Sequence, residues 1–348
     1  MPTKIFRHYG LAPLSGMVYN TVIEVIDMIT LSRIAKEAHV SVSTASKAFS
    51  GSPEVNEETR ELVFDVAKKY GCFKKFYKAK YSKFVVAIIC PEFSSIHYTN
   101  CLSQLGHYLE KANCEICVAE SGFSEKREME LLDYYYKHAV VDAIIVIEPL
   151  SWIRGYHEIP VLLVGPPSKD NDCATVFCDE APALAEAIQH LIDQGVTSMG
   201  FIGERLTKRK LHYFEDTLRA NGLTPNNEHI QIASKRFGAG GYEAMEKILK
   251  ADTLPRAVVC AYDDMAIGAI RCITDHGLRV PKDIAVLGFD DIPQAPYMVP
   301  PLASVDSRLK ELCKLTAATV TDLINGKEVP MHQIIPATLQ RRKSLEIK

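Results

Sequence analysis

The stretch LSRIAKEAHVSVSTASKAF, residues 31 to 49, indicates two short helices separated by a tight break. Thr30 and Ser41 precede the two helices, where a hydroxyl oxygen can accept a hydrogen bond from a free backbone N–H. In the first helix, apolar residues follow the spacing of one helical face, namely Leu31, Ile34, Ala35 and Ala38. In the second helix, the residues expected to face inward are Val42, Ala45, Ala48 and Phe49. A third helix, capped by Asn56, follows, so the segment predicts a helix-turn-helix unit.

The second helix is rich in hydroxyl side chains and carries one cation, Lys47. Ser and Thr are mediocre helix formers because they compete for backbone hydrogen bonds. Against DNA they are useful, because short hydroxyl side chains let the backbone approach and can bond phosphate oxygens. Lys47 can reach a guanine edge or a phosphate. The composition therefore favours a DNA-reading helix over a three-helix cap without a ligand.

The charges are unevenly distributed along the chain. Eleven basic and six acidic residues lie between Met28 and Lys83, which gives this part +5, whereas the whole chain has a formal net charge of −3. A basic module attached to a larger acidic body is typical of a regulator tethered to DNA, because only the DNA-binding end of such a protein needs to be attracted to phosphates. A solvated basic linker is the alternative reading of the same charges.

The composition, 47% hydrophobic and 24% charged, is that of a globular protein. No apolar run approaches the ~20 residues that cross a bilayer, so we expect no membrane partner. The ten cysteines are scattered, several of them inside apolar runs, which predicts a reduced, cytoplasmic protein. The CxxC of Cys114 and Cys117 has no second pair to complete a zinc set, and we expect no metal there.

Catalytic and cofactor motifs are weak or missing in the sequence. The run GAGG at residues 238 to 241 does not directly follow an apolar strand, so it is a poor dinucleotide loop. The eleven histidines form no HExxH motif, and a serine nucleophile elbow is absent. We therefore expect neither a cofactor nor enzymatic activity.

Continuous apolar runs alternate with amphipathic stretches after Lys83. The runs span residues 84–89, 142–147, 160–164, 199–202, 257–261 and 284–289. Strands without polar alternation, separated by helices, indicate parallel sheets covered on both faces. The length of this part predicts two similar α/β halves, and ligands of such sheets bind beyond the carboxyl ends of the strands.

Two long segments resemble the lactose-repressor (LacI/GalR) family. They are ITLSRIAKEAHVSVSTASKAFSGSPEVNEETRELVFDVAKKYG, residues 29 to 71, and YDDMAIGAIRCITDHGLRVPKDIAVLGFDDIP, residues 262 to 293, which PPLASV follows at residue 300. The resemblance implies an all-α helix-turn-helix headpiece and a periplasmic-binding-protein-like α/β core of two Rossmann-like subdomains. It further implies a homodimeric transcription regulator, most often a repressor, that binds double-stranded operator DNA with an inverted repeat. A small effector, typically a sugar or related metabolite, binds between the subdomains.

The chain is expected to divide into four parts. Residues 1–27 are expected to be a loose or mis-annotated extension before a natural start at Met28, because the first readable module opens there. The remaining parts are the helix-turn-helix domain, the hinge or linker, and the effector-binding and dimerisation core, at residues 28–72, 73–83 and 84–348. Subdomain 1 of the core is expected at about 84–177 and 308–335, and subdomain 2 at about 178–307 and 336–348.

The resemblance also implies which residues contact DNA. Residues matching base-edge contacts are Leu31, Val42, Ser43 and Lys47. Residues matching phosphate contacts are Thr30, Ser41, Thr44, Ser46, Ser50, Asn56 and Thr59. The hinge, CFKKFYKAKYSK, departs from the family, with Tyr81 near the position of a leucine that wedges into the minor groove. His39 replaces a customary glycine in the turn. This departure keeps open the alternative of a ligand-sensing protein with atypical DNA binding.

The expected effector pocket diverges from the family pattern. Lys210 replaces an arginine, Tyr262 replaces an asparagine and Gly165 replaces an aspartate, whereas Asp263 and Asp290 match. An ammonium cannot reproduce the five-donor fork of an arginine. Aromatic residues that either stack on a ligand or pack the core between the subdomains are Tyr98, Phe237, Tyr262 and Phe289.

Overall fold

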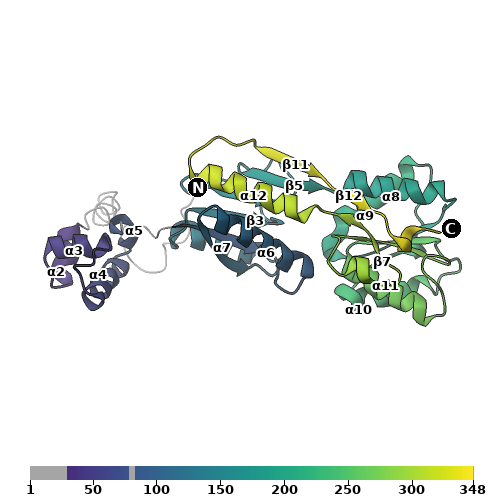
Figure 1. Ribbon diagram of the computed structural model, residues 1–348, viewed down its shortest axis with the longest axis horizontal. Helices are drawn as coiled ribbons and strands as arrows, with labels where there is room; N and C mark the ends of the chain where they lie inside the picture. The colour runs from purple at the N-terminus through teal and green to yellow at the C-terminus, as the bar shows by residue number, and fades with distance from the viewer. Residues whose placement is uncertain (1–29, 78–82, 348) are drawn as a thin grey trace, which may run out of the picture. The chain divides into compact units, whose positions relative to one another are not determined.

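The computed structural model describes residues 30–77 and 83–347, which fall into two compact units divided after Lys83 (Figure 1). The expected extension at residues 1–27, Tyr81 and the rest of 78–82 lie outside the described residues. Each unit is described by itself.

The N-terminal unit contains the three predicted helices and one further turn of helix. They are α2 (Leu31–Glu37), α3 (Val42–Phe49), α4 (Glu57–Lys69) and α5 (Phe73–Phe76). Ser41 and Asn56 cap α3 and α4 as predicted, because their side chains accept hydrogen bonds from the backbone N–H groups of Thr44 and Thr59. The predicted cap of α2 is correct in position only, since the Thr30 side chain makes no capping hydrogen bond to the described residues.

The small core of this unit contains the predicted inward residues except Val42, with Leu31 only partly buried against it. Its buried members are Ile34, Ala35, Ala38, Ala45, Ala48, Phe49, Val55, Val63 and Ala67. Val42 is 46% exposed, so its assignment to the inward face was wrong. It is the first residue of α3, where the chain enters the helix at the surface. Rings on α5 pack against Phe49 and Phe64, which joins the start of the expected hinge to the headpiece.

The backbone conformation of residue 39, in the turn between α2 and α3, is one that suits glycine. His39 has φ 53, in the left-handed region that costs a residue with a side chain about 1 kcal/mol or more. The turn therefore has the backbone geometry that glycine would adopt, and the backbone of His39 is strained in it.

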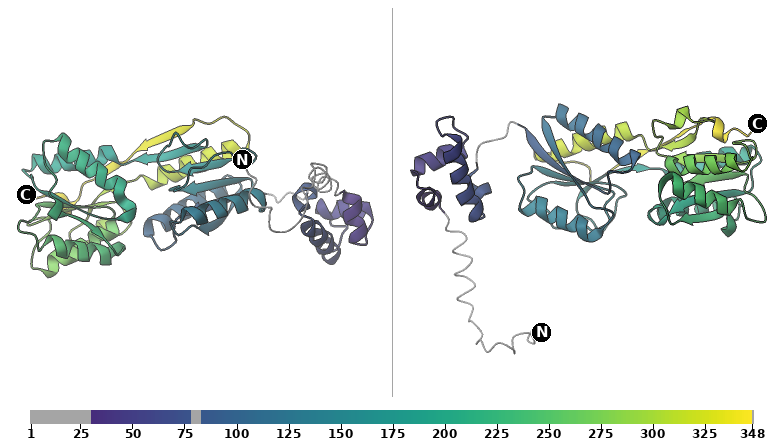
Figure 2. Two further views of the ribbon diagram at one scale, coloured as in Figure 1. Left: turned by 180° about the vertical axis from the view of Figure 1, so that it is seen from behind. Right: turned by 90° about the horizontal axis from the view of Figure 1, so that it is seen from below.

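The second unit consists of two six-stranded sheets with helices on both faces, which confirms the predicted fold class (Figures 1 and 2). The first sheet has the order β11-β5-β4-β3-β1-β2, and the second has the order β12-β10-β9-β8-β6-β7. The first contains β1 (Phe84–Cys90), β2 (Cys114–Glu120), β3 (Ala143–Ile147), β4 (Val161–Val164), β5 (Ala174–Asp179) and β11 (His332–Pro336). The second contains β6 (Met199–Glu204), β7 (Ile230–Ala233), β8 (Ala257–Cys260), β9 (Ala285–Phe289), β10 (Ala303–Asp306) and β12 (Thr338–Gln340). All pairings are parallel except that of β10 with β12.

Helices cover each sheet on both sides. In the first sheet, α7 (Glu125–Lys137) packs on one face, and α6 (Ile96–Lys111) and α12 (Leu309–Ile324) pack on the other. In the second sheet, α10 (Phe237–Ile248) and α11 (Asp263–Asp275) oppose α8 (Ala181–Asp193) and α9 (Lys208–Ala220). Short 3-10 helices occur at Arg205–Thr207, Asn227–His229, Ala295–Tyr297 and Lys343–Leu345.

The chain passes between the two sheets three times, after β5, after β10 and after β11. These crossings bring the carboxyl ends of the strands of both sheets to one region. The GAGG run of residues 238 to 241 lies inside α10 and packs against α11, so its glycines serve close helix contact. Strand β2 is an edge strand in which only Cys114 is buried.

Candidate DNA-binding helix and ligand cleft

Helix α3 presents hydroxyl groups on the face opposite its buried alanines. Ser41, Val42, Ser43 and Ser46 are exposed and Thr44 is half-buried. The Ser41 oxygen lies 2.9 Å from the Thr44 nitrogen and 2.8 Å from the Thr44 hydroxyl. This face is therefore polar, carries small side chains and lies at a helix N-terminus, which suits close contact with a phosphate backbone.

Lys47 is held by an ion pair with Glu54, which follows α3 in the chain. The two side chains are 44% and 66% exposed. Exposed pairs of this kind contribute about 0–1 kcal/mol, so a phosphate or base edge can replace Glu54 as the partner of Lys47.

The remaining predicted DNA contacts lie on the same unit with varied exposure. Thr30 and Asn56 are exposed, and Leu31 and Thr59 are half-buried. The exposed Ser50 donates its hydroxyl to the carbonyl of Lys47 at 3.1 Å. Both ends of α3 and the start of α4 thus carry polar groups at the surface.

A cavity of about 340 Å³ lies at the carboxyl ends of strands from both sheets of the second unit. Five of the predicted effector residues line it: Tyr98, Lys210, Phe237, Tyr262 and Asp290. Gly165, which follows β4, also lines it. This location agrees with the expected position of ligands in open α/β sheets.

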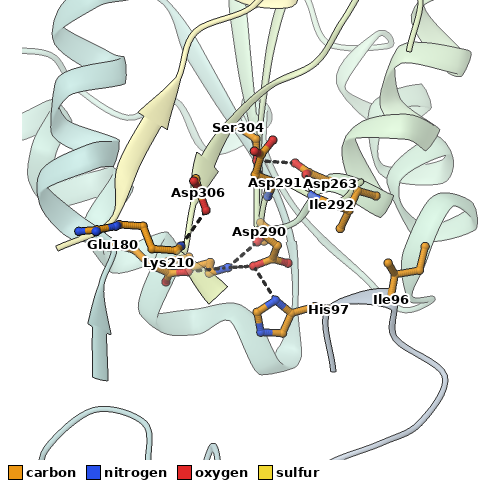
Figure 3. Close-up of polar contacts among 12 residues, drawn as sticks. Ile96, His97, Glu180, Lys210, Asp263, Asp290, Asp291, Ile292, Ser304 and Asp306 are labelled. Carbon is orange, nitrogen blue, oxygen red and sulfur yellow. Dashed lines mark hydrogen bonds and ion pairs between the residues drawn. The ribbon is translucent and has the colours of Figure 1, made fainter. Parts of the chain in front are cut away.

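Asp263 and Phe289 do not line the cavity, which corrects two predicted contacts. Asp263 is fully buried and accepts hydrogen bonds from the Ile292 N–H at 2.9 Å and the Ser304 hydroxyl at 2.7 Å (Figure 3). Its carboxylate therefore fixes the loop after β9. Phe289 is also fully buried and lies 4.4 Å beneath the Lys210 ammonium, so it supports a pocket residue without facing the cavity.

Lys210 connects several acceptors at one side of the cavity. Its Nζ lies 3.2 Å from Glu180, 3.5 Å from Asp290 and 3.0 Å from the carbonyl of Ala261. Burial lowers the pKa of Lys210, but the charges of Asp290 and Glu180 outweigh that effect and raise the pKa above its usual value. Figure 3 shows Asp290 between Lys210 and His97, whose Nδ1 is 3.6 Å from the carboxylate.

Arg236 joins the two sheets at the other side of the cavity. It pairs with Glu92, which follows β1, and its Nε lies 2.7 Å from Glu204 at the end of β6. Burial disfavours the charged guanidinium, but hydrogen bonds with both carboxylates raise the pKa of Arg236 above its usual value. Its guanidinium lies 5.0 Å from the ring of Phe123 and 4.7 Å from that of Phe237. The arginine is thereby fixed between two aromatic walls.

Sequence reasoning missed most of the charged pocket residues. Besides Arg236 and Glu204, these are His97, Glu148, Glu180 and Arg209. A detectable signal was present for two of them, because Glu148 and Glu180 follow the apolar runs of β3 and β5. Arg209 was adjacent to the predicted Lys210, and its Nη1 lies 3.6 Å from Glu148 across the cleft.

A small helical unit with a polar recognition face, joined to a two-sheet α/β core with a charged cleft, defines a DNA-binding regulator that responds to a small molecule. Residues 30–72 match the model of bacterial regulatory proteins of the lacI family, and residues 188–345 match the periplasmic binding protein-like domain. The chain belongs to the lacI family of bacterial regulatory proteins. The expected family, fold class and DNA-binding regulatory function are thus confirmed.

Relatives match over nearly their whole length. The transcriptional regulator AscG of Escherichia coli K12 is 26% identical over 333 residues, which cover 91% of this chain and 98% of the relative. The transcriptional repressor PurR of Pasteurella multocida is 29% identical, covering 86% of this chain and 93% of the relative. The lac repressor dimer bound to operator and the anti-inducer ONPF has a TM-score of 0.68 at 20% identity, covering 91% of this chain and 99% of that chain.

A helix long and apolar enough to span a membrane does not occur among residues 30–77 and 83–347.

Proposed function

We propose that this protein is a cytoplasmic, homodimeric transcriptional repressor that reads an inverted-repeat operator through α3. A small effector, a sugar or related metabolite, binds in the cleft between the two sheets and changes operator affinity. The relatives are named as regulators, which favours a binding function over catalysis. In a dimer the two recognition helices would lie about 34–36 Å apart, one turn of DNA.

The exposed polar face of α3 is the observation that carries the DNA-binding proposal. Val42 and Ser43 are small, so they supply at most a thymine-methyl contact and one hydrogen bond. Lys47 is the residue on this helix that can make a strong contact with a guanine. We infer that backbone positioning and DNA deformation contribute much of the sequence preference.

The effector proposal rests on the shape and chemistry of the cleft. A cavity of about 340 Å³ lies at the small end of the size range typical of ligand pockets. The lining combines hydrogen-bonding side chains with the rings of Tyr98, Phe123 and Phe177, which is suitable for a hydroxylated ring. A structure of the same fold is that of the regulator CelR with cellobiose, at a TM-score of 0.64 and 24% identity.

Selection of genomic DNA fragments by the purified full-length chain tests the function. We expect recovery of a palindromic sequence whose protection in a footprint spans two half-sites one helical turn apart. Affinity should fall steeply with salt, by about 0.9 log units per phosphate contact per decade of concentration. The Lys47→Ala variant should bind the same site more weakly. Recovery of no palindrome at any salt concentration would overturn the proposal.

A further inference from the structure

Carboxylates outnumber cations in the cleft. Arg209, Lys210 and Arg236 are the cations that line it or bridge it. Each of them contacts two carboxylates, and the five carboxylates involved are Glu92, Glu148, Glu180, Glu204 and Asp290. Three side-chain cations therefore face five carboxylates among these described residues, and His97 lies 3.6 Å from one of them, Asp290. Unbalanced charge is costly in a site shielded from water, so the cleft is electrostatically matched to a positively charged guest.

Glu180 gives this imbalance a definite position. The residue is 6% exposed and lines the cavity, and its Oε1 lies 3.2 Å from Lys210. Its Oε2 is buried and accepts no hydrogen bond from the described residues. The nearest guanidinium nitrogen, Nη2 of Arg209, lies 3.9 Å from it, beyond hydrogen-bonding distance. A buried carboxylate oxygen without a donor is strongly unfavourable, and a ligand that donates to it removes that cost.

A bound metal ion does not explain the excess of carboxylates. The described part of the chain contains no group of three or more His, Cys, Asp or Glu side chains placed to hold a metal. The carboxylates are instead divided among three cations, in an arrangement of ion pairs that can accept one more organic cation.

We propose that the effector carries a cationic amine, as an amino sugar or another aminated polyol does, and that Glu180 is the main acceptor of its ammonium group. The inference rests on the proposed function, because it names the chemical class of the molecule bound in the same cleft. An ammonium group offers three donors and one positive charge, which match the free oxygen and reduce the charge imbalance. Anionic sugars such as uronates meet repulsion from the same carboxylates.

A panel of matched probes tests the charge of the effector. Glucosamine, galactosamine and mannosamine, their three N-acetyl forms, and glucuronate are titrated against the full-length protein at constant ionic strength, with the melting temperature as readout. At least one amine should raise the melting temperature and bind at least tenfold more tightly than its neutral N-acetyl form. Equal or tighter binding of an N-acetyl form or of glucuronate overturns the proposal.

Variants locate the amine site. Glu180→Gln should weaken amine binding at least tenfold and should weaken binding of the neutral N-acetyl forms much less, because only the amines carry the charge that Glu180 neutralises. Glu186→Gln is the matched control, because Glu186 lies on α8, the helix that Glu180 directly precedes, and pairs with Arg341 at the surface. If no amine in the panel binds, the melting temperatures of the two variants are compared without any ligand. Removal of one of the repelling carboxylate charges should then give Glu180→Gln a higher melting temperature than Glu186→Gln. An equal or lower temperature then overturns the proposal.

The proposed regulatory function and the proposed charge of the effector are tested by different results. A neutral sugar that releases the protein from its operator, where amines do not, shows that the charge class is wrong and that the regulator is real. Failure of genomic DNA selection, in contrast, removes the proposed function even if amines bind.

Discussion

Glu54→Gln should increase the affinity of the protein for its operator, because Glu54 competes with DNA for Lys47. The Lys47–Glu54 pair must break before the ammonium can contact a base or phosphate. With the side chains 44% and 66% exposed, solvent screens the pair, and its contribution is at most about 1 kcal/mol. Since 1.4 kcal/mol is a tenfold change, the gain in affinity should reach about fivefold.

A double-mutant cycle with Lys47→Ala separates release of Lys47 from a general effect of charge. The single Lys47→Ala variant should lose about 1–3 kcal/mol of operator binding, or roughly 5- to 150-fold. In that background Glu54→Gln should have no effect, because there is no ammonium to release. The assay is a gel-shift or fluorescence-anisotropy titration at one fixed salt concentration.

Asp65→Asn provides the matched control, because Asp65 pairs with Lys68 on α4 at 3.4 Å and its loss changes the charge of the same unit equally. This control should leave affinity close to that of the parent protein. If Glu54→Gln strengthens binding as much with Ala at position 47 as with Lys, then Glu54 acts through its charge alone and the assigned restraint of Lys47 is incorrect.

Three further predictions concern stability. Ser41→Ala should lower the stability of the helical unit by about 1 kcal/mol, seen as faster hydrogen exchange of α3 amides, with the exposed Ser43→Ala as the neutral control. Gly241→Ala should lower the free energy of unfolding in urea by about 1–3 kcal/mol, because its Cβ would lie 2.0 Å from a backbone oxygen of α11; Gly238→Ala, with 3.6 Å available, should be tolerated. Arg236→Gln should cost up to about 3 kcal/mol in the same assay, because it leaves two carboxylates, each 7% exposed, without their cation; an unchanged urea midpoint would contradict the bridging role.

The sequence predicted the parts of the fold that are encoded locally. The caps at Ser41 and Asn56 and the long apolar runs were correct, because each depends on residues a few positions apart. Strands β5, β7, β10, β11 and β12 lie outside the predicted runs. Strands β7, β10 and β12 have only three or four residues, and β11 alternates exposed and half-buried residues. Val42 was assigned to the core because helical spacing alone does not show that the first turn of α3 lies at the surface.

The candidate cleft was predictable only where the family motif supplied its positions. Tyr262 and Asp290 were found through the motif, but the same motif suggested Asp263, whose neighbours in space, Ser304 and Ile292, bury it completely. Glu180 follows β5 of the first sheet and Arg236 follows β7 of the second, and both line one cavity because the chain passes repeatedly between the sheets. Such convergence depends on long-range topology, which spacing in the sequence does not report.

The ion pairs of the cleft limit how an effector can act. Arg209 and Arg236 contact Glu148 and Glu92 across the two sheets, so separating the sheets breaks both pairs. A ligand shifts this equilibrium only by the difference in its affinity for the two arrangements. One charged hydrogen bond to Glu180 contributes about 1.5–3 kcal/mol, whereas moving a population from 1:99 to 99:1 needs about 5.5 kcal/mol. An ammonium group alone is therefore insufficient for a full switch, and the remaining difference must come from hydroxyl groups that contact both sheets at once.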